Sequence, residues 1–253
     1  LHAELGMVER AVPAFEEFRR WATGQHADDD LGYALANLAF AADESGDAER
    51  ASGLMAAAEW AARATDSLPD RAVVLGYAGL LALRQAGGPA DAERAAGLLR
   101  TAVELHHDTG QLICMPELVC LLGVAQHRAG RSETGARILA TGNGWAAARG
   151  IRPGRLARQL IDETERELVR EVPTARLTAA RAMGSLVRFG SLGGLDELTR
   201  AEPVGRSLDL REPEDRHGPP TVRGGLIPSG RHRGDDPLLS AAKPHQGDPP
   251  SQM

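Results

Sequence analysis

Five side chains that could bind zinc lie between residues 106 and 127. Thiolates and imidazoles are the usual zinc ligands in proteins, but the spacing of these five fits neither the paired-cysteine nor the paired-histidine pattern of known zinc sites. A histidine near the C-terminal end of a helix is stabilised by the helix dipole, and an isolated cysteine on an apolar face usually packs in the core. We therefore predict structural roles for the whole set, which is His106, His107, Cys114, Cys120 and His127.

Two shorter motifs carry part of a ligand-binding pattern. The acids Asp28–Asp30 could hold a divalent cation, but the rest of a calcium loop does not follow, and helix capping by Asp30 is predicted instead. The glycines of Gly142–Trp145 lack the remainder of a phosphate-binding fingerprint and are predicted to allow close helix packing. No protease or hydrolase motif is present. The sequence therefore predicts no catalytic residue, no metal site and no cofactor, and an enzyme is not expected.

The charge balance disfavours several further classes of function. Acidic residues outnumber basic ones by 35 to 29, so the net charge of -6 gives no general attraction to a phosphate backbone. Lys243 is the only lysine, and residues 1–201 contain none. A P-loop and a Schiff-base enzyme each need a lysine at a fixed place. We predict no direct nucleic-acid binding by this segment and neither of these two enzyme chemistries.

The cellular setting is predicted from cysteine usage and hydropathy. Two cysteines six residues apart form no disulfide framework. No apolar run reaches the roughly 18 to 20 residues that span a bilayer, and no secretory signal pattern is seen. These observations predict a cytoplasmic protein without membrane contact. Because the sequence begins at Leu1 rather than at methionine, we expect it to be part of a longer chain.

A repeated hexapeptide reveals the elements that must position these side chains. GDAERA at 46–51 returns as ADAERA at 90–95, and its glutamate marks a repeat of 40, 44 and 40 residues through Glu9, Glu49, Glu93 and Glu133. Amphipathic stretches precede and follow each marker, which predicts helix, turn, helix in every unit. In each unit the Asp or Ser is predicted to cap the next helix, and the alanine after Glu-Arg to leave room for its neighbour. Aromatics make up only 4% of the chain, so an all-α fold packed by Ala and Leu is predicted.

Small and apolar residues recur at matching places in the first helix, the turn and the second helix of the units. These residues are Leu38-Ala39, Leu122-Gly123, Gly46, Gly130, Ala51, Ala95, Gly135, Met55, Leu99, Leu139, Ala58, Ala102 and Gly142. At these positions the repeat resembles the tetratricopeptide repeat, although its period is longer than the usual 34 residues and the family's aromatics and closing proline are missing. In its length and alanine content it is similar to the C-terminal regions of actinobacterial signal-transduction ATPase transcriptional regulators, of the LuxR type or the antibiotic-regulatory type. The resemblance implies a right-handed solenoid of antiparallel helix pairs.

Three segments are expected along the chain. Residues 1–172 form the repeat solenoid, and residues 173–201 form a short helical cap. Residues 202–253 hold nine of the fifteen prolines and no sustained apolar period, so a disordered tail is predicted there. Trp21, Trp60 and Trp145 all fall late in second helices, where packing is predicted.

The resemblance also implies a concave groove lined by the first helix of each unit. Two aromatic rings in an acidic patch would suit a peptide or helix with basic and apolar residues. A solvated helix face without a ligand is the alternative. The family's groove positions fall on Tyr33, Phe40, Asp43, Glu44, Gln85, Glu117, His127 and Arg128.

Three hypotheses for function follow. The first is a protein-interaction or sensor module that forms the C-terminal part of a multidomain ATPase-type transcriptional regulator. The second is a free-standing adaptor that binds a partner peptide in its groove. The third is a helical metal-dependent enzyme built on the histidine and cysteine cluster. Residues 1–5 resemble the end of a helix whose partners are absent, so self-association through the N-terminal face is also expected.

Overall fold

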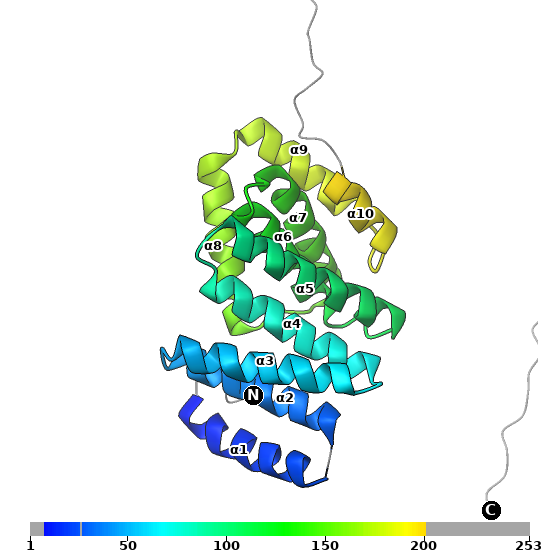
Figure 1. Ribbon diagram of the computed structural model, residues 1–253. Coiled ribbons are helices and arrows are strands. Elements are labelled where there is room, and N and C mark those ends of the chain that lie inside the picture. Colours follow the sequence, from blue (N-terminus) through cyan, green and yellow to red (C-terminus); the bar gives the residue numbers. More distant parts are fainter. Residues whose placement is uncertain (1–7, 26, 201–253) are drawn as a thin grey trace, which may run out of the picture. The chain divides into compact units, whose positions relative to one another are not determined.

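The computed structural model describes residues 8–25 and 27–200, and all regular structure within these residues is α-helical, which confirms the all-α prediction (Figure 1). These residues belong to the first of the two units into which the chain divides, residues 1–208. The predicted tail at 202–253 and the predicted self-association face at 1–5 lie outside the described residues. The ten helices are α1 (Val8–Gln25), α2 (Asp28–Glu44), α3 (Ala48–Ala64), α4 (Leu68–Gln85), α5 (Pro89–Asp108), α6 (Met115–Arg128), α7 (Ser132–Arg149), α8 (Arg155–Glu171), α9 (Thr174–Ser185) and α10 (Leu192–Arg200).

The first copy of the hexapeptide starts α3 as the sequence predicts. The Asp47 carboxylate accepts the backbone N–H of Arg50 at 3.0 Å and so caps the first turn. Gly46 precedes it with φ +82°, in the left-handed region, and Gly130 has the same φ before α7. A residue with a Cβ adopts this conformation only at a cost in free energy, which explains glycine at both turns.

The other predicted caps are wrong. Asp30 lies inside the first turn of α2, because this helix begins at Asp28 and follows Ala27 without a side-chain cap. Asp91, in the second hexapeptide, lies inside α5 and accepts the N–H of Gly87. Proline at the start of α5 lets the helix begin earlier than the hexapeptide alone indicates.

Consecutive helices pack side by side as α2 with α3, α4 with α5, and α6 with α7 (Figure 1). The backbones of α6 and α7 come into direct contact, because glycines face each other there. A Cβ built on Gly135 would lie 2.8 Å from the carbonyl oxygen of Gly123 and 2.9 Å from the backbone nitrogen of His127. The alanines after Glu-Arg follow the same logic, since Ala51 and Ala95 are fully buried. Small residues therefore set the helix spacing.

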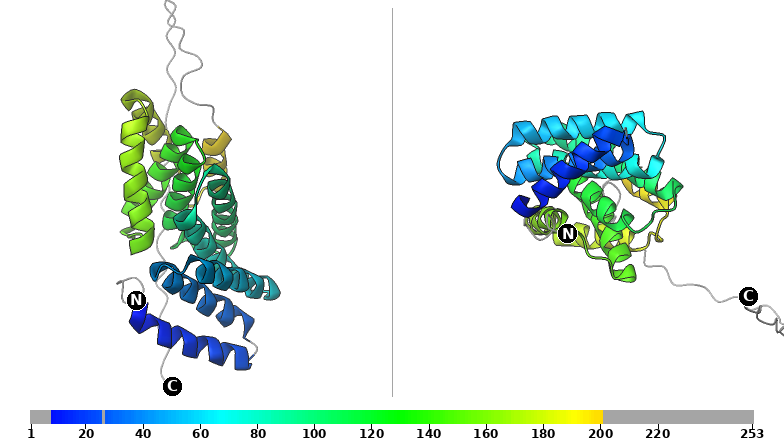
Figure 2. Two further views of the ribbon diagram at one scale, coloured as in Figure 1. Left: turned by 60° about the vertical axis from the view of Figure 1, so that its left-hand side comes forward. Right: turned by 90° about the horizontal axis from the view of Figure 1, so that it is seen from below.

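The order of packing changes after α7. Up to that point each pair contacts the next, through α2 with α4 and α5 with α6. Beyond it, α9 rather than α8 packs along α7, while α8 lies against α6 and runs across the direction of α2 and α4 (Figure 2). Gly150 ends α7 with φ +63°, and the Gly154 N–H donates to Glu117 at 2.6 Å, which fixes the connecting loop on the α6 side.

Three side chains one turn apart on α7 hold the segment of α9 and α10. Each donates a hydrogen bond to a backbone carbonyl of that segment, so the contact does not depend on the apolar side chains alone. The three bonds run from Arg137 to Leu198 at 3.1 Å, from Thr141 to Gly184 at 2.9 Å and from Trp145 to Val187 at 2.9 Å.

Only one of the three tryptophans packs as predicted. Trp145 is buried, and its ring contacts Phe189 with centroids 5.3 Å apart. Trp60 is 66% exposed, because α3 packs through the stripe of Ala51, Met55, Ala58 and Ala62 and Trp60 lies off that stripe. Trp21 is 50% exposed and stacks on Phe18. The packing prediction is therefore wrong for Trp60 and for Trp21, which are both exposed.

Among the described helices, none combines the length and the apolar content that a bilayer-crossing helix requires.

Candidate interaction surface

The eight residues predicted to line a groove fall into separate groups. Tyr33 and Phe40 of α2 join an aromatic row, whereas Asp43, Glu44 and Gln85 join a charged cluster at the ends of α2 and α4. His127 and Arg128, at the end of α6, face α8. Glu117, at the start of α6, contacts the loop between α7 and α8. The structure thus brings seven of the eight together in three groups and places Glu117 apart from them.

The aromatic row crosses three helices. The Phe15 ring of α1 meets the Tyr33 ring of α2 edge-on at a centroid distance of 6.4 Å, and Tyr33 meets Tyr77 of α4 at 6.1 Å. Phe40 is buried beneath, with its ring edge against Tyr77 at 5.5 Å. Tyr33 is 40% exposed, and among the described residues its hydroxyl has no hydrogen-bond partner. The row is therefore supported from below and open above Tyr33.

The acids of the predicted groove are paired with arginines. Arg84 of α4 donates through Nε to Asp43 at 2.6 Å, and its Nη2 lies 3.7 Å from Glu44. Arg155, the first residue of α8, also pairs with Glu44. Gln85 donates to the other oxygen of Asp43 at 3.1 Å. These pairs balance the charge of the acids, so this cluster has no strong negative field to attract a basic partner.

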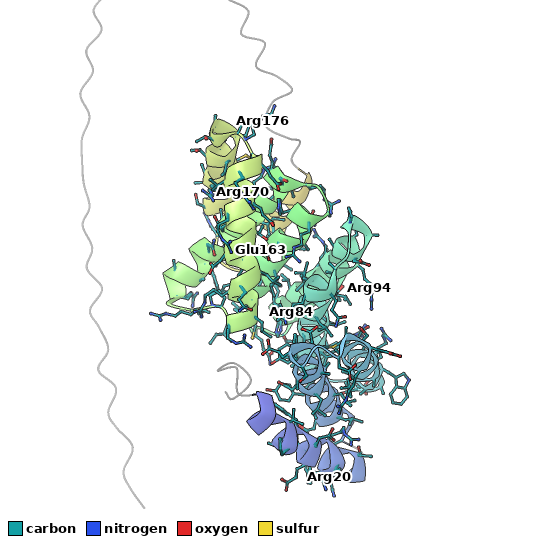
Figure 3. The ribbon with its side chains drawn as sticks, turned by 90° about the vertical axis from the view of Figure 1, so that its left-hand side faces the viewer. Arg20, Arg84, Arg94, Glu163, Arg170 and Arg176 are labelled. Carbon is teal, nitrogen blue, oxygen red and sulfur yellow. The ribbon has the colours of Figure 1, made fainter. Side chains whose placement is uncertain are left out.

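Helix α8 covers the end of α6. The Nε2 of His127 lies 3.2 Å from Glu167, and Arg128 lies 3.3 Å from Glu163. Figure 3 faces this side of the molecule, with Glu163 labelled on α8 and Arg84 below it. Beside these acids on α8, Leu160, Ile161 and Leu168 are buried. The predicted positions at the end of α6 are thus engaged by the chain itself.

The five possible zinc ligands are dispersed. His106 is 1% exposed within α5, while His107 at the end of the same helix is exposed. Cys114 is exposed before α6, and Cys120 is buried within it. Among the residues that the structure describes, no three His, Cys, Asp or Glu side chains gather closely enough to hold a metal ion. The core position predicted for Cys120 is confirmed.

A cavity of about 290 Å³ lies beside the aromatic row. Tyr77 belongs to both, and the cavity continues between α4 and α6 under the loops at 109–114 and 150–154. His106 is part of its wall, and the Nδ1 atom of His106 has no hydrogen-bond partner among the described residues. Its lining is completed by Val73, Gly76, Leu80, Ile113, Cys114, Glu117, Leu118, Leu121, Ile151 and Arg152.

Burial changes the protonation of two groups at this cavity. It lowers the pKa of the His106 imidazole, and a hydrogen bond with Gln111 opposes this only in part. Burial, and after it the charge of Glu117, raises the pKa of the Cys114 thiol. Both shifts favour the uncharged form, because an apolar surrounding solvates charge poorly. At neutral pH the cavity therefore has a neutral imidazole and a neutral thiol.

The lowered pKa of His106 predicts that the stability of the protein depends on pH. Because its pKa is lower in the folded chain, only the unfolded chain binds this proton just below the usual pKa of about 6.5. The contribution of His106 to the free energy of unfolding is expected to be constant above that pH. It should decrease as the pH falls below about 6.5 and level off once folded His106 is also protonated. Urea unfolding at pH 7.5 and 5.5 measures this, and the decrease should be smaller in His106→Leu. An equal decrease in both proteins would contradict the expectation.

No family model, curated protein or solved structure matches this chain. The features of the chain that bear on function are the aromatic row and the cavity. Sequence reasoning found Tyr33 and missed both Tyr77 and the cavity. A signal for Tyr77 was present, since Tyr33 and Tyr77 are 44 residues apart, which is also the spacing of Glu49 and Glu93. No sequence signal placed His106 at the same cavity as residues of α6, because that arrangement depends on how the helices and loops pack.

Proposed function

We propose that this chain is a tetratricopeptide-like interaction module, in which the helix pairs form a right-handed solenoid and the aromatic row receives a peptide from a partner protein. The observation that carries the proposal is the open ring of Tyr33, set between Phe15 and Tyr77. The tyrosine side chain offers a large apolar face and a hydroxyl group, and it has few rotatable bonds. Such side chains dominate the binding energy of many interfaces.

The partner that fits is a segment whose apolar side chains lie along the row. Asp43 and Glu44 are paired with arginines, so a basic partner gains little from them. An apolar or aromatic side chain on the Tyr33 ring would bury the exposed fraction of that ring. A backbone carbonyl or amide of the peptide can pair with the Tyr33 hydroxyl. The partner is thus recognised by apolar contact and one polar group.

The setting of the module is a second part of the proposal. The motif resemblance supports a place in the cytoplasmic, C-terminal part of a multidomain ATPase-type transcriptional regulator. A free-standing adaptor would use the same surface, and the two differ only in what the rest of the protein does. In both, the partner is a protein or peptide.

The test uses a random peptide library displayed on phage and selected on the whole chain. We expect selected peptides to bind Tyr33→Ala at least about 10-fold more weakly, the loss typical of truncating a central aromatic contact. Trp60→Ala is the matched control, because Trp60 is also an exposed aromatic on a helix but lies off the row. Unchanged Kd in Tyr33→Ala, or a loss of binding in Trp60→Ala alone, would reject the surface. Equal far-UV circular dichroism in both variants shows that the fold is retained.

A further inference from the structure

The cavity beside the aromatic row has the size and lining of a small-molecule site. Its volume of about 290 Å³ is close to the lower end of known ligand pockets. At the roughly 30 Å³ that one water occupies in the liquid, it accommodates about ten non-hydrogen atoms. The occupant is therefore a compact molecule, too small to be a peptide.

The walls of the cavity favour an occupant with an apolar body. Val73 and Leu80 line the cavity from α4, and Leu118 and Leu121 line it from α6. Leu80, Leu118 and Leu121 are themselves buried in the core, so this part of the wall is held in place by packing. A ligand gains binding free energy at such a wall when its apolar surface leaves water and contacts these side chains.

The charged groups of the cavity balance each other. Glu117 contributes one negative charge, and this carboxylate is already held by the Gly154 N–H. Arg152 contributes one positive charge and forms no ion pair with the described residues; it is exposed at the rim. With one charge of each sign, the lining gives no net preference for an anion or a cation.

His106 supplies the polar group that orients a ligand. It is 1% exposed, and its Nδ1 has no hydrogen-bond partner among the described residues. Buried polar groups of native proteins are rarely left in this condition. Because this atom has almost no surface open to water, the imidazole has to turn toward the cavity to meet a ligand. A neutral imidazole nitrogen is a donor in one tautomer and an acceptor in the other. A hydroxyl can serve in both roles, so it matches Nδ1 in either tautomer.

We propose that this cavity binds a small uncharged molecule with an apolar body and one hydroxyl group, of the alkylphenol type, whose hydroxyl pairs with His106. The site is separate from the peptide surface of the proposed function, although Tyr77 contacts both. Failure of one proposal leaves the other standing, because the peptide test does not involve His106.

Cys114 gives a direct readout of occupancy. It lines the cavity and is exposed, so N-ethylmaleimide can reach it at pH 8. Cys120 is buried in the core and its pKa is raised strongly by burial, so it stays unmodified. Mass spectrometry of the intact chain therefore follows one alkylation. A molecule in the cavity should slow it by covering the thiol.

The experiment compares 4-ethylphenol with ethylbenzene on the whole chain. We expect 4-ethylphenol to slow alkylation of Cys114 in the folded protein and to have no effect in urea. Ethylbenzene should protect with an affinity about 2- to 12-fold lower, which is the range for loss of one neutral hydrogen bond. No protection by either compound up to its solubility would overturn the site. Equal affinities would overturn the role of His106 and with it the ligand class.

Two variants locate the effect. Val73→Trp fills the cavity from a half-buried position and should abolish protection by 4-ethylphenol, whereas Arg71→Trp adds the same ring on the exposed side of α4 and should leave it unchanged. Protection that survives Val73→Trp would place binding elsewhere and reject the site. His106→Phe should make the two probes equal in affinity. If this variant does not fold, the comparison of the two probes on the unaltered chain still decides the role of the imidazole.

Discussion

Gly135→Ala is expected to destabilise the protein by about 3 kcal/mol, at the upper end of the usual cost of overpacking. The added methyl would lie 2.8 Å from the Gly123 carbonyl oxygen and 2.9 Å from the His127 nitrogen. Both are backbone atoms of α6, so no side-chain rotation can relieve the overlap. The two helices would have to separate, which loosens the buried contacts along their whole length. Urea unfolding followed by circular dichroism at the helix band measures the loss.

Gly144→Ala is the matched control in the same helix. Gly144 is exposed, and a Cβ there would meet no atom within 4 Å. Alanine is favoured over glycine in a helix interior by about 0.5 to 1 kcal/mol, so this variant should be more stable than the unaltered chain. A destabilisation of similar size in both variants would show that the glycines act through the turn propensity of α7 rather than through contact with α6.

Glu133→Ala is expected to lower the free energy of unfolding by about 3 kcal/mol, because it leaves a buried cation without this carboxylate. Arg137 is 0% exposed, and its Nη2 lies 3.8 Å from Glu133. Burial lowers the pKa of Arg137, and the charge of Glu133 opposes that shift. Methionine in place of the arginine removes the charge and keeps most of the volume. Arg137→Met should therefore cost less, mainly the hydrogen bond to Leu198.

The decisive measurement is the double variant Glu133→Ala with Arg137→Met. It should be more stable than Glu133→Ala alone, since the buried charge has been removed together with the carboxylate beside it. Arg176→Ala is the control, because Arg176 pairs with the other oxygen of the Glu133 carboxylate. That ion pair is partly exposed and should contribute at most about 1 kcal/mol. A double variant less stable than Glu133→Ala would mean that packing of the arginine stem, not its charge, is what the core requires.

The helix pairs were predictable because their signals are local. The hexapeptide, the apolar periodicity and the small residues each act within one or two turns, and they located α2 to α7. The course of α8 was not predictable in this way. It depends on Gly150 ending α7 and on contacts such as Arg155 with Glu44, which are 111 residues apart. No local pattern encodes such a pairing, so the sequence indicated an amphipathic helix but not the side of α6 on which it lies.

The candidate site shows the same division. Tyr33 was found from its place in the repeat, and Tyr77 follows from the repeat length. The acidic patch was predicted from two acids in sequence, but their arginine partners come from α4 and α8. Exposure of Trp60 was missed for a related reason. A second helix with alanine at most positions can bury a narrow stripe, and the ring lies outside it.

The uneven placement of the three indoles has an optical consequence. Trp21 and Trp60 are in contact with water, whereas Trp145 is enclosed and donates to the Val187 carbonyl of the segment between α9 and α10. Iodide quenches the fluorescence of the two outer indoles and leaves a shorter-wavelength emission from Trp145. That residual emission reports on one contact, the packing of α9 and α10 against α7. Release of this terminal segment would thus be visible as a shift of the residual emission to longer wavelength before the helices from α1 to α6 have unfolded.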